Sequence, residues 1–470
     1  MNYSDFLASK KLLPASHPIL HDGIHANLFP FQKQVAEFAL NKGRAALFLD
    51  TGLGKTITQC EWARHIPGEV LIVAPLAVAS QTVREARERL GMDVVYSKDG
   101  AVSSRVTITN YERLDKFNCA QFKGVVLDES SILKGFMGKT KQLLCDSFSK
   151  TPYRLACTAT PAPNDHMELG NHSQFLGVMP STEMLARWFI NDPSKVGAYR
   201  VKGHAEADFW QWVGSWAACI SKPSDLGFDD GAYNLPPLKM HTHTVNTPLQ
   251  AGEADELFAM PTSSATDLHK TKRLTIRERC ELTAELASAT NGSSLVWCES
   301  NDESAMLAKL IPDAVEVNGS DSMEYKEAAA DWFLGFELSP ESERLMGKLM
   351  GVDPSQRKMV TKASMFGYGL NFQHASHMVF ASISYSYESF YQAIRREWRF
   401  GQKKPVNVHV VISDAELPVW RTIERKAEQH DEMKRQMVKA IMGGQETNIK
   451  NAYVLRATAQ LPAWLEGRAT

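Results

Sequence analysis

The chain has 470 residues, of which 23% are charged and 44% hydrophobic, and its formal net charge is −2. This balance is typical of a soluble globular protein, and the length allows about two to four domains. No apolar run approaches the ~20 residues of a membrane span, and the start "MNYSDFLASKKLLPASHPIL" lacks the apolar core of a secretion signal. We therefore expect a cytoplasmic protein in which any nucleic-acid binding depends on local patches.

The seven cysteines are scattered along the chain, and their number is odd. They show neither CxxC pairing nor the spacing of metal ligands. This usage favours reduced thiols in a cytosol-like compartment over a disulfide framework or a zinc site.

Short apolar runs rich in β-branched residues alternate with longer helical patterns. They form two sets, one at 44–50, 69–75, 106–111, 124–129 and 153–160, and the other at 293–300, 314–320, 358–364, 377–382 and 406–413. Continuous apolar strands separated by helices predict parallel sheets covered on both faces. The fold class is therefore α/β, with two doubly wound lobes and a cleft between them. Ligands are expected at the carboxyl ends of the strands.

A Trp-rich stretch separates the two sets, and its helical aromatic spacing predicts packing. The "LPP" that follows breaks the chain and marks the lobe boundary. In the tail, "VWRTIERKAEQHDEMKRQMVKAIM" predicts an amphipathic helix that two glycines end. The expected domains are an N-terminal segment (1–27), a first lobe (28–164), a helical insertion (165–236), a second lobe (237–414) and a helical tail (415–470).

The sequence "LFLDTGLGKTITQ" runs from an apolar strand through glycines into a helical pattern. Gly52 and Gly54 let backbone N–H groups curl around phosphate oxygens, and the helix N-terminus adds partial positive charge. Lys55 is expected to reach the β- and γ-phosphates of ATP, and the Thr56 hydroxyl to ligate Mg²⁺. The first glycine of the usual GxxxxGK[ST] pattern is missing, because Leu49 stands there.

Two further strands end in polar side chains that suit phosphoryl transfer. "VVLDESS" ends its strand in Asp128, which can hold Mg²⁺, and Glu129, which can polarise the attacking water. "LACTATPAPND" closes another strand with Thr158 and Thr160. Their hydroxyls could link the γ-phosphate to movement of a lobe.

The sequence "QAIRREWRFGQKK" concentrates positive charge in the second half of the chain. Phosphoryl transfer builds negative charge, which an arginine delivered from another lobe stabilises. Arg396 and Arg399 stand three apart and would share one face of a helix, whereas Arg395 would point away from it. They would reach ATP only when the lobes close, which is how an ATPase becomes a motor. The alternative is a solvated helix face.

The order and spacing of these motifs resemble those of superfamily 2 helicases, most closely the SWI/SNF-type chromatin-remodelling ATPases. The similar sequences in the first half are "LFPFQ", "DTGLGKT" (motif I), "LIVAPLAVASQ" (motif Ia), "ITNYERL" (motif Ib), "LDESSILK" (motif II) and "TATPAPN" (motif III). In the second half they are "SLVWCES" (motif IV), "GYGLNFQHASHMVF" (motif V) and "QAIRREWRFGQKKPVNVHVV" (motif VI). The similarity covers about residues 28–412. It implies two RecA-like lobes that hydrolyse ATP in the cleft and translocate along duplex DNA.

The resemblance implies a role for each matching position. The catalytic positions are Lys55, Asp128, Glu129, Arg396 and Arg399. The nucleotide contacts, with the first of them near the base, are Gln32, Thr51, Gly52, Leu53, Gly54, Lys55, Thr56 and Gly369. The Mg²⁺ ligands are Thr56 and Asp128, and coupling between the lobes falls to Thr158, Thr160 and Gln392.

The residues that contact the polynucleotide should bind its phosphates without recognising the base sequence. The positions implied for them are Pro75, Leu76, Gln81, Thr109, Asn110, Ser300, Asn301, Asn371 and Gln373. We therefore expect a monomer that uses ATP and Mg²⁺, binds double-stranded DNA regardless of sequence, and needs no membrane.

Three features depart from the family's pattern. Motif II reads DESS, so Ser131 replaces the residue that often couples the lobes, and Trp398 replaces a common histidine in motif VI. The segment between the lobes is also short. These features favour a compact, prokaryotic or viral motor over a nucleosome remodeller. The alternatives are a strand-separating DNA or RNA helicase and a nucleotide-gated clamp with little turnover.

Overall fold

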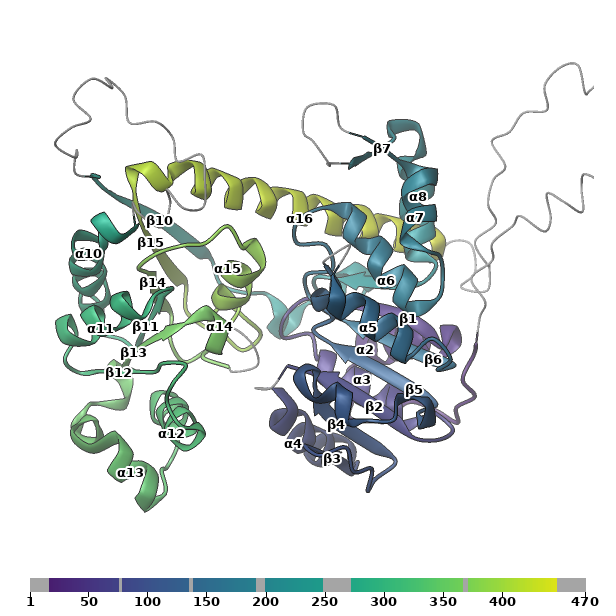
Figure 1. The fold of residues 1–470 in the computed structure, drawn as a ribbon, viewed down its shortest axis with the longest axis horizontal. Helices are drawn as coiled ribbons and strands as arrows, with labels where there is room; N and C mark the ends of the chain where they lie inside the picture. The colour runs from purple at the N-terminus through teal and green to yellow at the C-terminus, as the bar shows by residue number, and fades with distance from the viewer. Residues whose placement is uncertain are drawn as a thin grey trace, which may run out of the picture.

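The computed structural model describes residues 17–75, 78–134, 138–191, 199–247, 272–366 and 371–445 of the chain. Two α/β lobes lie side by side, and a long C-terminal helix runs across both of them (Figure 1). The first lobe has a seven-stranded sheet and the second a six-stranded sheet, which confirms the predicted fold class. No helix in these ranges is both long and apolar enough to cross a membrane.

The first sheet has the strand order β3-β4-β2-β5-β6-β1-β9, and every neighbouring pair is parallel. Its strands are β1 (Arg44–Leu49), β2 (Val70–Ala74), β3 (Val94–Tyr96), β4 (Val106–Asn110), β5 (Gly124–Asp128), β6 (Tyr153–Cys157) and β9 (Ala217–Ile220). The helices of this lobe are α2 (Pro30–Lys42), α3 (Lys55–Arg64), α4 (Ala79–Leu90), α5 (Lys139–Ser147), α6 (Leu169–Leu176), α7 (Ser181–Trp188) and α8 (Glu206–Gly214). Short 3-10 turns occur at Tyr111–Lys116, Cys119–Gln121, Ser130–Lys134, His166–Glu168, Gly203–Ala205, Pro223–Leu226 and Gly231–Tyr233.

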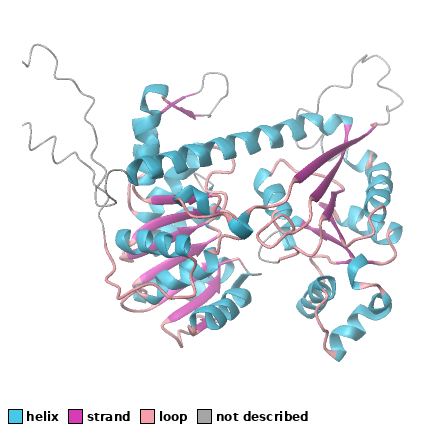
Figure 2. Ribbon diagram, turned by 180° about the vertical axis from the view of Figure 1, so that it is seen from behind, coloured by secondary structure: helices cyan, strands magenta, loops and turns pink. Residues whose placement is uncertain are grey.

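The central strands of this sheet are buried along almost their whole length. Helices cover both faces of the sheet (Figure 2), and a separate hydrophobic core fills each face. Buried parallel strands of this kind explain the continuous apolar runs in the sequence. Because β6 lies between β5 and β1, the carboxyl ends of these three strands meet at one edge of the sheet. Motifs I, II and III therefore converge there.

Part of the predicted helical insertion belongs to the first lobe. Besides α6, α7 and α8, the segment contains an antiparallel pair of strands, β7 (Phe189–Asn191) and β8 (Tyr199–Val201). It also contains β9, which pairs with β1 and extends the first sheet. Sequence reasoning missed β9 because "AACI" is short, has one β-branched residue and directly follows a Trp-rich helix. The packing expected of the tryptophans is confirmed, since all are buried in the first lobe's core, at Trp188, Trp210, Trp212 and Trp216.

The second sheet has the order β10-β15-β14-β11-β13-β12, again with parallel neighbours throughout. Its strands are β10 (Leu238–Val245), β11 (Ser294–Cys298), β12 (Ala314–Glu316), β13 (Lys358–Lys362), β14 (His377–Phe380) and β15 (Val406–Ser413). Its helices are α10 (Ile276–Ser288), α11 (Asn301–Leu310), α12 (Met323–Leu334), α13 (Pro340–Met346), α14 (Ala363–Phe366) and α15 (Tyr387–Ile394). Short 3-10 turns lie at Gly347–Gly351, Pro354–Gln356 and Asp414–Glu416. Two hydrophobic cores again occupy the two faces.

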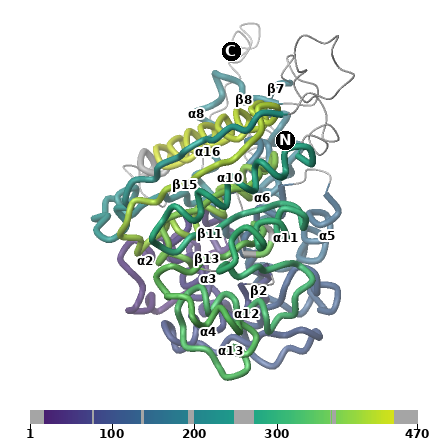
Figure 3. Tube along the Cα trace, turned by 90° about the vertical axis from the view of Figure 1, so that its left-hand side faces the viewer, coloured from purple at the N-terminus to yellow at the C-terminus, as the bar shows by residue number. Residues whose placement is uncertain are grey.

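The C-terminal helix α16 (Leu417–Gln445) belongs to the cores of both lobes. Its first half places Val419 and Ile423 in the second lobe, and its second half places Met433 and Met437 in the first. Figure 3 shows it beside β15 and close to α8. The helix runs to Gln445, one residue beyond the two glycines that were predicted to end it.

Glu397, in the turn after α15, is a buried carboxyl group at the centre of the second lobe's packing. It is 0% exposed, and neither side-chain oxygen has a hydrogen-bond partner among the described residues. Burial raises its pKa well above the usual value, which favours the uncharged form in the folded protein. A polar group buried without partners lowers the stability of the fold.

We expect Glu397→Met, which has a similar volume and no polar oxygen, to raise the free energy of unfolding at pH 7 by about 1–3 kcal/mol. The folded-state pKa is raised, so the wild type loses stability as pH rises above the unfolded value of about 4.3. The gain from the substitution should therefore grow between pH 5 and pH 8 in urea unfolding. Glu388, which is also buried but pairs with Lys134 at 2.5 Å, is the matched control. Glu388→Met should lower stability, and a gain of equal size in both variants would contradict the interpretation.

Candidate nucleotide and nucleic-acid site

The loop between β1 and α3 has the backbone shape of a phosphate-binding loop. Gly52 and Gly54 have φ angles of 95° and 83°, which residues with side chains rarely adopt, and α3 begins at Lys55. Gln32 lies against the loop, with its Nε2 donating to Leu53 O at 3.0 Å. A Cβ added to Gly54 would lie 2.3 Å from that nitrogen. The resemblance places Gln32 near the base, and here its amide supports the loop that presents the N-terminus of α3 to a phosphate.

Lys55 and Glu129 form an ion pair at the edge where β1 and β5 end. Lys55 Nζ lies 2.8 Å from Glu129 Oε1, and the two side chains are 11% and 14% exposed. Glu129 has φ of 51° and is the sole non-glycine residue with positive φ in the described part of the chain. Backbone strain of this kind clusters at functional sites. Thr158 Oγ1 donates to Glu129 Oε2 at 3.4 Å, so side chains from motifs I, II and III form one network.

Asp128, at the end of β5, is 3% exposed. Burial and the neighbouring Glu129 charge raise its pKa to about 6, although Lys55 opposes the shift. A buried carboxylate with incomplete charge compensation favours a cation, and with the Thr56 hydroxyl it offers the oxygen ligands that Mg²⁺ prefers. In nucleotide sites Mg²⁺ takes one or two protein ligands and completes its shell with phosphates and water. The described residues contain no cluster of three or more His, Cys, Asp or Glu that could hold a metal ion.

The residues predicted to couple the lobes are buried in hydrogen-bond networks. The Thr160 N–H donates to Thr158 Oγ1 at 3.1 Å, which ties motif III to the Glu129 carboxylate. Gln392 is fully buried in the second lobe. Ser131, the departure in motif II, donates to Glu129 O at 3.5 Å within its own motif. Coupling through these side chains stays a prediction.

Motif VI does not form the helix that its spacing predicts. α15 ends at Ile394, and hydrogen bonds between residues three apart then make tight turns. Arg395, the first residue after α15, reaches the first lobe, where its Nη2 lies 3.3 Å from Thr51 O and 3.6 Å from Asp50 Oδ2. The expectation that Arg395 points away from the site was therefore wrong. Helical spacing gave the faces of α15, but the docking of the lobes decides which face meets the phosphate loop.

Arg396 and Arg399 occupy different surroundings within this turn. Arg396 is 3% exposed, and its Nε and Nη2 donate to the O and Oε1 atoms of Gln392, each at 3.0 Å. Arg399 is half-buried. Burial and the nearby Arg395 charge lower its pKa to about 10, whereas Glu85 of the first lobe opposes the shift. Arg399 therefore lies within electrostatic reach of the first lobe.

The second lobe also contacts the phosphate loop through Phe400. A Cβ added to Gly52 would lie 3.0 Å from the Phe400 Cβ. The Phe400 ring lies 4.4 Å from that of Tyr233, in the segment that joins the lobes. Any nucleotide bound at this loop would thus have the second lobe as its immediate neighbour.

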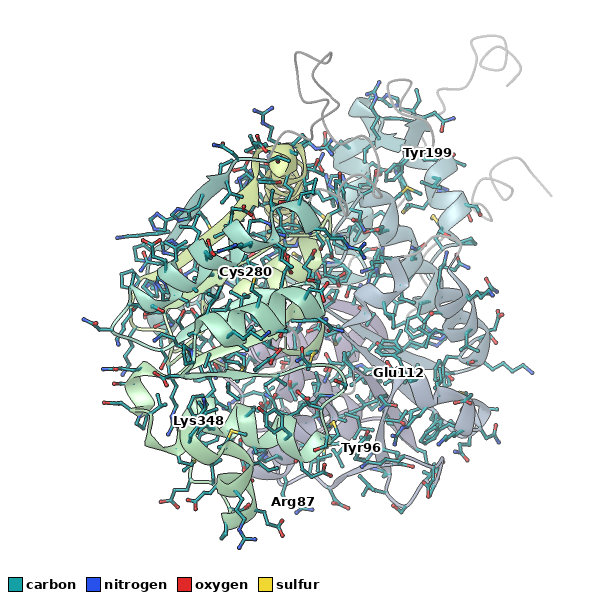
Figure 4. The ribbon with its side chains drawn as sticks, turned by 60° about the vertical axis from the view of Figure 1, so that its left-hand side comes forward. Arg87, Tyr96, Glu112, Tyr199, Cys280 and Lys348 are labelled. Atoms are coloured by element: carbon teal, nitrogen blue, oxygen red, sulfur yellow. The ribbon has the colours of Figure 1, made fainter. Side chains whose placement is uncertain are left out.

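A cavity of about 1220 Å³ lies between the lobes beside this network. Glu112, which Figure 4 labels, lines the cavity on the side of the first lobe. Side chains of the second lobe line its other side. The lining includes four predicted polynucleotide contacts, Pro75, Gln81, Asn371 and Gln373. Acidic residues outnumber Lys and Arg in the lining, with Glu85, Glu88, Glu112, Glu129, Glu327, Asp331 and Glu388 against Arg84, Arg89, Lys134 and Lys326. Because this charge repels phosphate, we expect a polynucleotide to cross the rim of the cavity.

The structure does not bring the other predicted polynucleotide contacts to this cavity. Thr109 and Asn110 are buried and hydrogen-bonded within the first lobe, where they support β4. Ser300 caps α11, and Asn301 accepts a hydrogen bond from Lys362 at 2.6 Å. Two further predicted site residues lie outside the described ranges, Leu76 and Gly369.

Sequence reasoning missed one cluster next to the phosphate loop. Asp50 accepts hydrogen bonds from Tyr391 of α15 and Lys434 of α16, each at 2.5 Å. The position of Asp50, a carboxylate directly before the loop, was a signal that could have been used. Lys434 gave none, since it is one of many charged residues in the tail helix.

No family model matches the chain. The DNA annealing helicase and endonuclease ZRANB3 of Mus musculus is 25% identical over 456 residues, which cover 87% of this chain and 41% of that protein. The SWI/SNF-related matrix-associated actin-dependent regulator of chromatin subfamily A-like protein 1 of Xenopus tropicalis is 29% identical over 170 residues, 33% of this chain and 18% of that protein. The uncharacterized ATP-dependent helicase YqhH of Bacillus subtilis (strain 168) is 28% identical over 172 residues, 32% of this chain and 30% of that protein.

A similarity over 87% of the chain extends through both lobes and cannot be confined to the common phosphate loop. The chain is homologous to SWI/SNF-type, superfamily 2 helicase-like ATPases. It spans 41% of the length of the ZRANB3 relative. The solved Sulfolobus solfataricus SWI2/SNF2 ATPase core in complex with dsDNA matches 92% of this chain and 97% of that chain, with 17% identity and a TM-score of 0.41.

Proposed function

We propose that this chain is a motor that hydrolyses ATP between its lobes and translocates on double-stranded DNA. The observation that carries the proposal is the phosphate loop, which contacts motif II on one side and motif VI on the other. Lys55 pairs with Glu129 within the first lobe, while Arg395 and Phe400 reach the loop from the second. A nucleotide bound there would act on both lobes at once, which is the requirement for converting hydrolysis into movement.

The network suggests how the chain's own residues would act. When Lys55 binds the β- and γ-phosphates, its pairing with Glu129 weakens, and Glu129 becomes available to orient the attacking water. Thr158 can transmit the state of Glu129 to motif III. Mg²⁺ held by Thr56 and Asp128 would neutralise charge on the phosphates. Arg396 and Arg399 would stabilise the negative charge of the transition state.

Double-stranded DNA is the proposed track for two reasons. The resemblance to duplex translocases favours movement without strand separation, and the ZRANB3 relative, a DNA annealing helicase, favours DNA over RNA. The lining of the cavity also includes the neutral residues Pro75, Gln81, Asn371 and Gln373, and where these reach the rim they suit phosphate contacts that carry no base information. The runner-up is a strand-separating helicase.

The hydrolytic role of Glu129 is open to a direct test. Glu129→Gln should retain Mg-ATP binding while turnover falls by roughly 10²-fold or more, since the water loses its base. Lys55→Ala should instead weaken nucleotide binding itself. A fluorescent ATP analogue measures binding, and phosphate release measures turnover. Hydrolysis at the wild-type rate by Glu129→Gln would show that this carboxylate has another role.

The arginine of motif VI should act mainly on turnover. We expect Arg399→Ala to keep nucleotide affinity within a few-fold while the DNA-stimulated rate falls by ~10³-fold, in the range of arginine fingers. Arg399→Lys should rescue poorly, because a point charge cannot reproduce a planar two-pronged contact. Arg421, an exposed arginine of the second lobe on α16, provides the matched control. Equal and near-wild-type rates for Arg399→Ala and Arg421→Ala would favour a solvated surface instead.

The polynucleotide can be identified by the ATPase rate with duplex DNA, single-stranded DNA and RNA in turn. We expect duplex DNA to stimulate most, regardless of sequence, with binding that weakens steeply with salt through counterion release. The motor should also displace the third strand of a triplex with little unwinding of a forked duplex. Efficient fork unwinding without triplex displacement would support the helicase alternative. Tight nucleic-acid binding with no stimulated turnover would support the clamp.

A further inference from the structure

Asp50, the residue directly before the phosphate loop, is a buried carboxylate shared by three elements. It lies at the end of β1 and is 8% exposed. Its Oδ1 accepts hydrogen bonds from Tyr391 OH of α15 and Lys434 Nζ of α16, each at 2.5 Å. Its Oδ2 lies 3.6 Å from Arg395 Nη2. One carboxylate therefore joins the first lobe, the second lobe and the C-terminal helix.

Asp50 is paired with two buried cations, and the Asp431 carboxylate of α16 also interacts with both of them. Lys434 and Arg395 are 7% and 5% exposed, and they share the single carboxylate of Asp50. Although burial raises the pKa of Asp50, Lys434 and then Arg395 hold it well below its usual range, so the carboxylate is ionised.

The backbone connects this cluster to the loop over a very short path. Asp50 N–H donates to Ile220 O of β9 at 3.0 Å, and Asp50 O accepts from the Leu53 N–H at 3.2 Å. Arg395 also donates to Thr51 O at 3.3 Å. The orientation of Asp50 thus sets the direction in which the chain enters the loop.

Lys434 is held firmly by its helix. Its neighbour Met433 and the following Met437 are buried in the core of the first lobe. Its Nζ lies 5.1 Å from the centre of the Tyr391 ring, in addition to its contact with Asp50. A lysine held in this way can fix the position of the Asp50 carboxylate.

We propose that Lys434 is a positioning residue of the nucleotide site, which makes α16 a functional part of that site. It acts through Asp50 on the shape of the phosphate loop. The inference rests on the proposed function, because it requires that the loop bind ATP. The loop holds the phosphates in the ground state and in the transition state alike. Loss of Lys434 should therefore weaken nucleotide binding more than turnover.

Lys434→Met is the informative variant, because Arg395 still pairs with the Asp50 carboxylate and the protein should still fold. We expect the Kd for Mg-ATP to rise by about tenfold or more, with kcat within about threefold of the wild type. Lys434→Arg should return the Kd to near the wild-type value. A cavity of about 1200 Å³ borders Lys434 and leaves room for the larger cation. The matched control is Arg435→Met, one residue along the helix, where the side chain is 70% exposed.

Thermal unfolding tests the charge cluster without nucleotide. Asp50→Asn removes the carboxylate that pairs with both buried cations and should lower Tm strongly. In that background Lys434→Met should raise Tm, because it removes one of two like charges, whereas in the wild-type background it should lower Tm. Such a reversal of sign is the mark of direct coupling in a double-mutant cycle. Additive changes in Tm would overturn the proposed pairing.

The outcomes separate this inference from the proposed function. A Lys434→Met variant with wild-type Kd, or a Lys434→Arg variant as weak as Lys434→Met, overturns the positioning role. A wild-type protein that binds Mg-ATP without hydrolysing it contradicts the proposed function and leaves the Kd comparison valid. A wild-type protein that binds no Mg-ATP overturns both.

Discussion

The phosphate loop is supported by side chains from several other elements, and much of the structure follows from that arrangement. Two glycines in the left-handed region make the turn possible, yet they contribute no side chains to fix it. The loop is therefore held by its neighbours, with Gln32 against its backbone, Glu129 on its lysine and Arg395 on a carbonyl. The strand order β5-β6-β1 supplies the first-lobe contacts, and the docking of the second lobe supplies the rest.

Because the supports come from separate elements, nucleotide binding involves the whole molecule. Arg395 and Phe400 come from the second lobe, and Lys434 comes from a helix embedded in both hydrophobic cores. A change at the phosphates would alter the contacts that the loop makes with the second lobe and with α16. Conversely, a shift of α16 or of the second lobe would alter the loop. Reciprocal dependence of this kind is the physical basis for coupling hydrolysis to movement.

The charge distribution limits where a polynucleotide can lie. The chain is nearly neutral, and the cavity between the lobes has more acidic than basic side chains in its lining. The buried cations near the loop, Arg395 and Lys434, pair with Asp50 beside the site where the nucleotide phosphates would bind. They are therefore not exposed to a polynucleotide. A DNA backbone would therefore meet neutral side chains and backbone amides at the rim, which suits binding without regard to sequence.

The sequence by itself determined the α/β class, the two lobes and the motifs of the nucleotide site, because these depend on local patterns. Apolar runs specify buried parallel strands, and a strand followed by glycines and lysine specifies a phosphate loop. Only the tertiary structure decided that β9 joins the first sheet, that Arg395 faces the first lobe, and that Lys434 meets Asp50 across 384 residues of chain. These features depend on which surfaces meet. Such outcomes are set by packing between distant segments, and no local pattern in the chain encodes them.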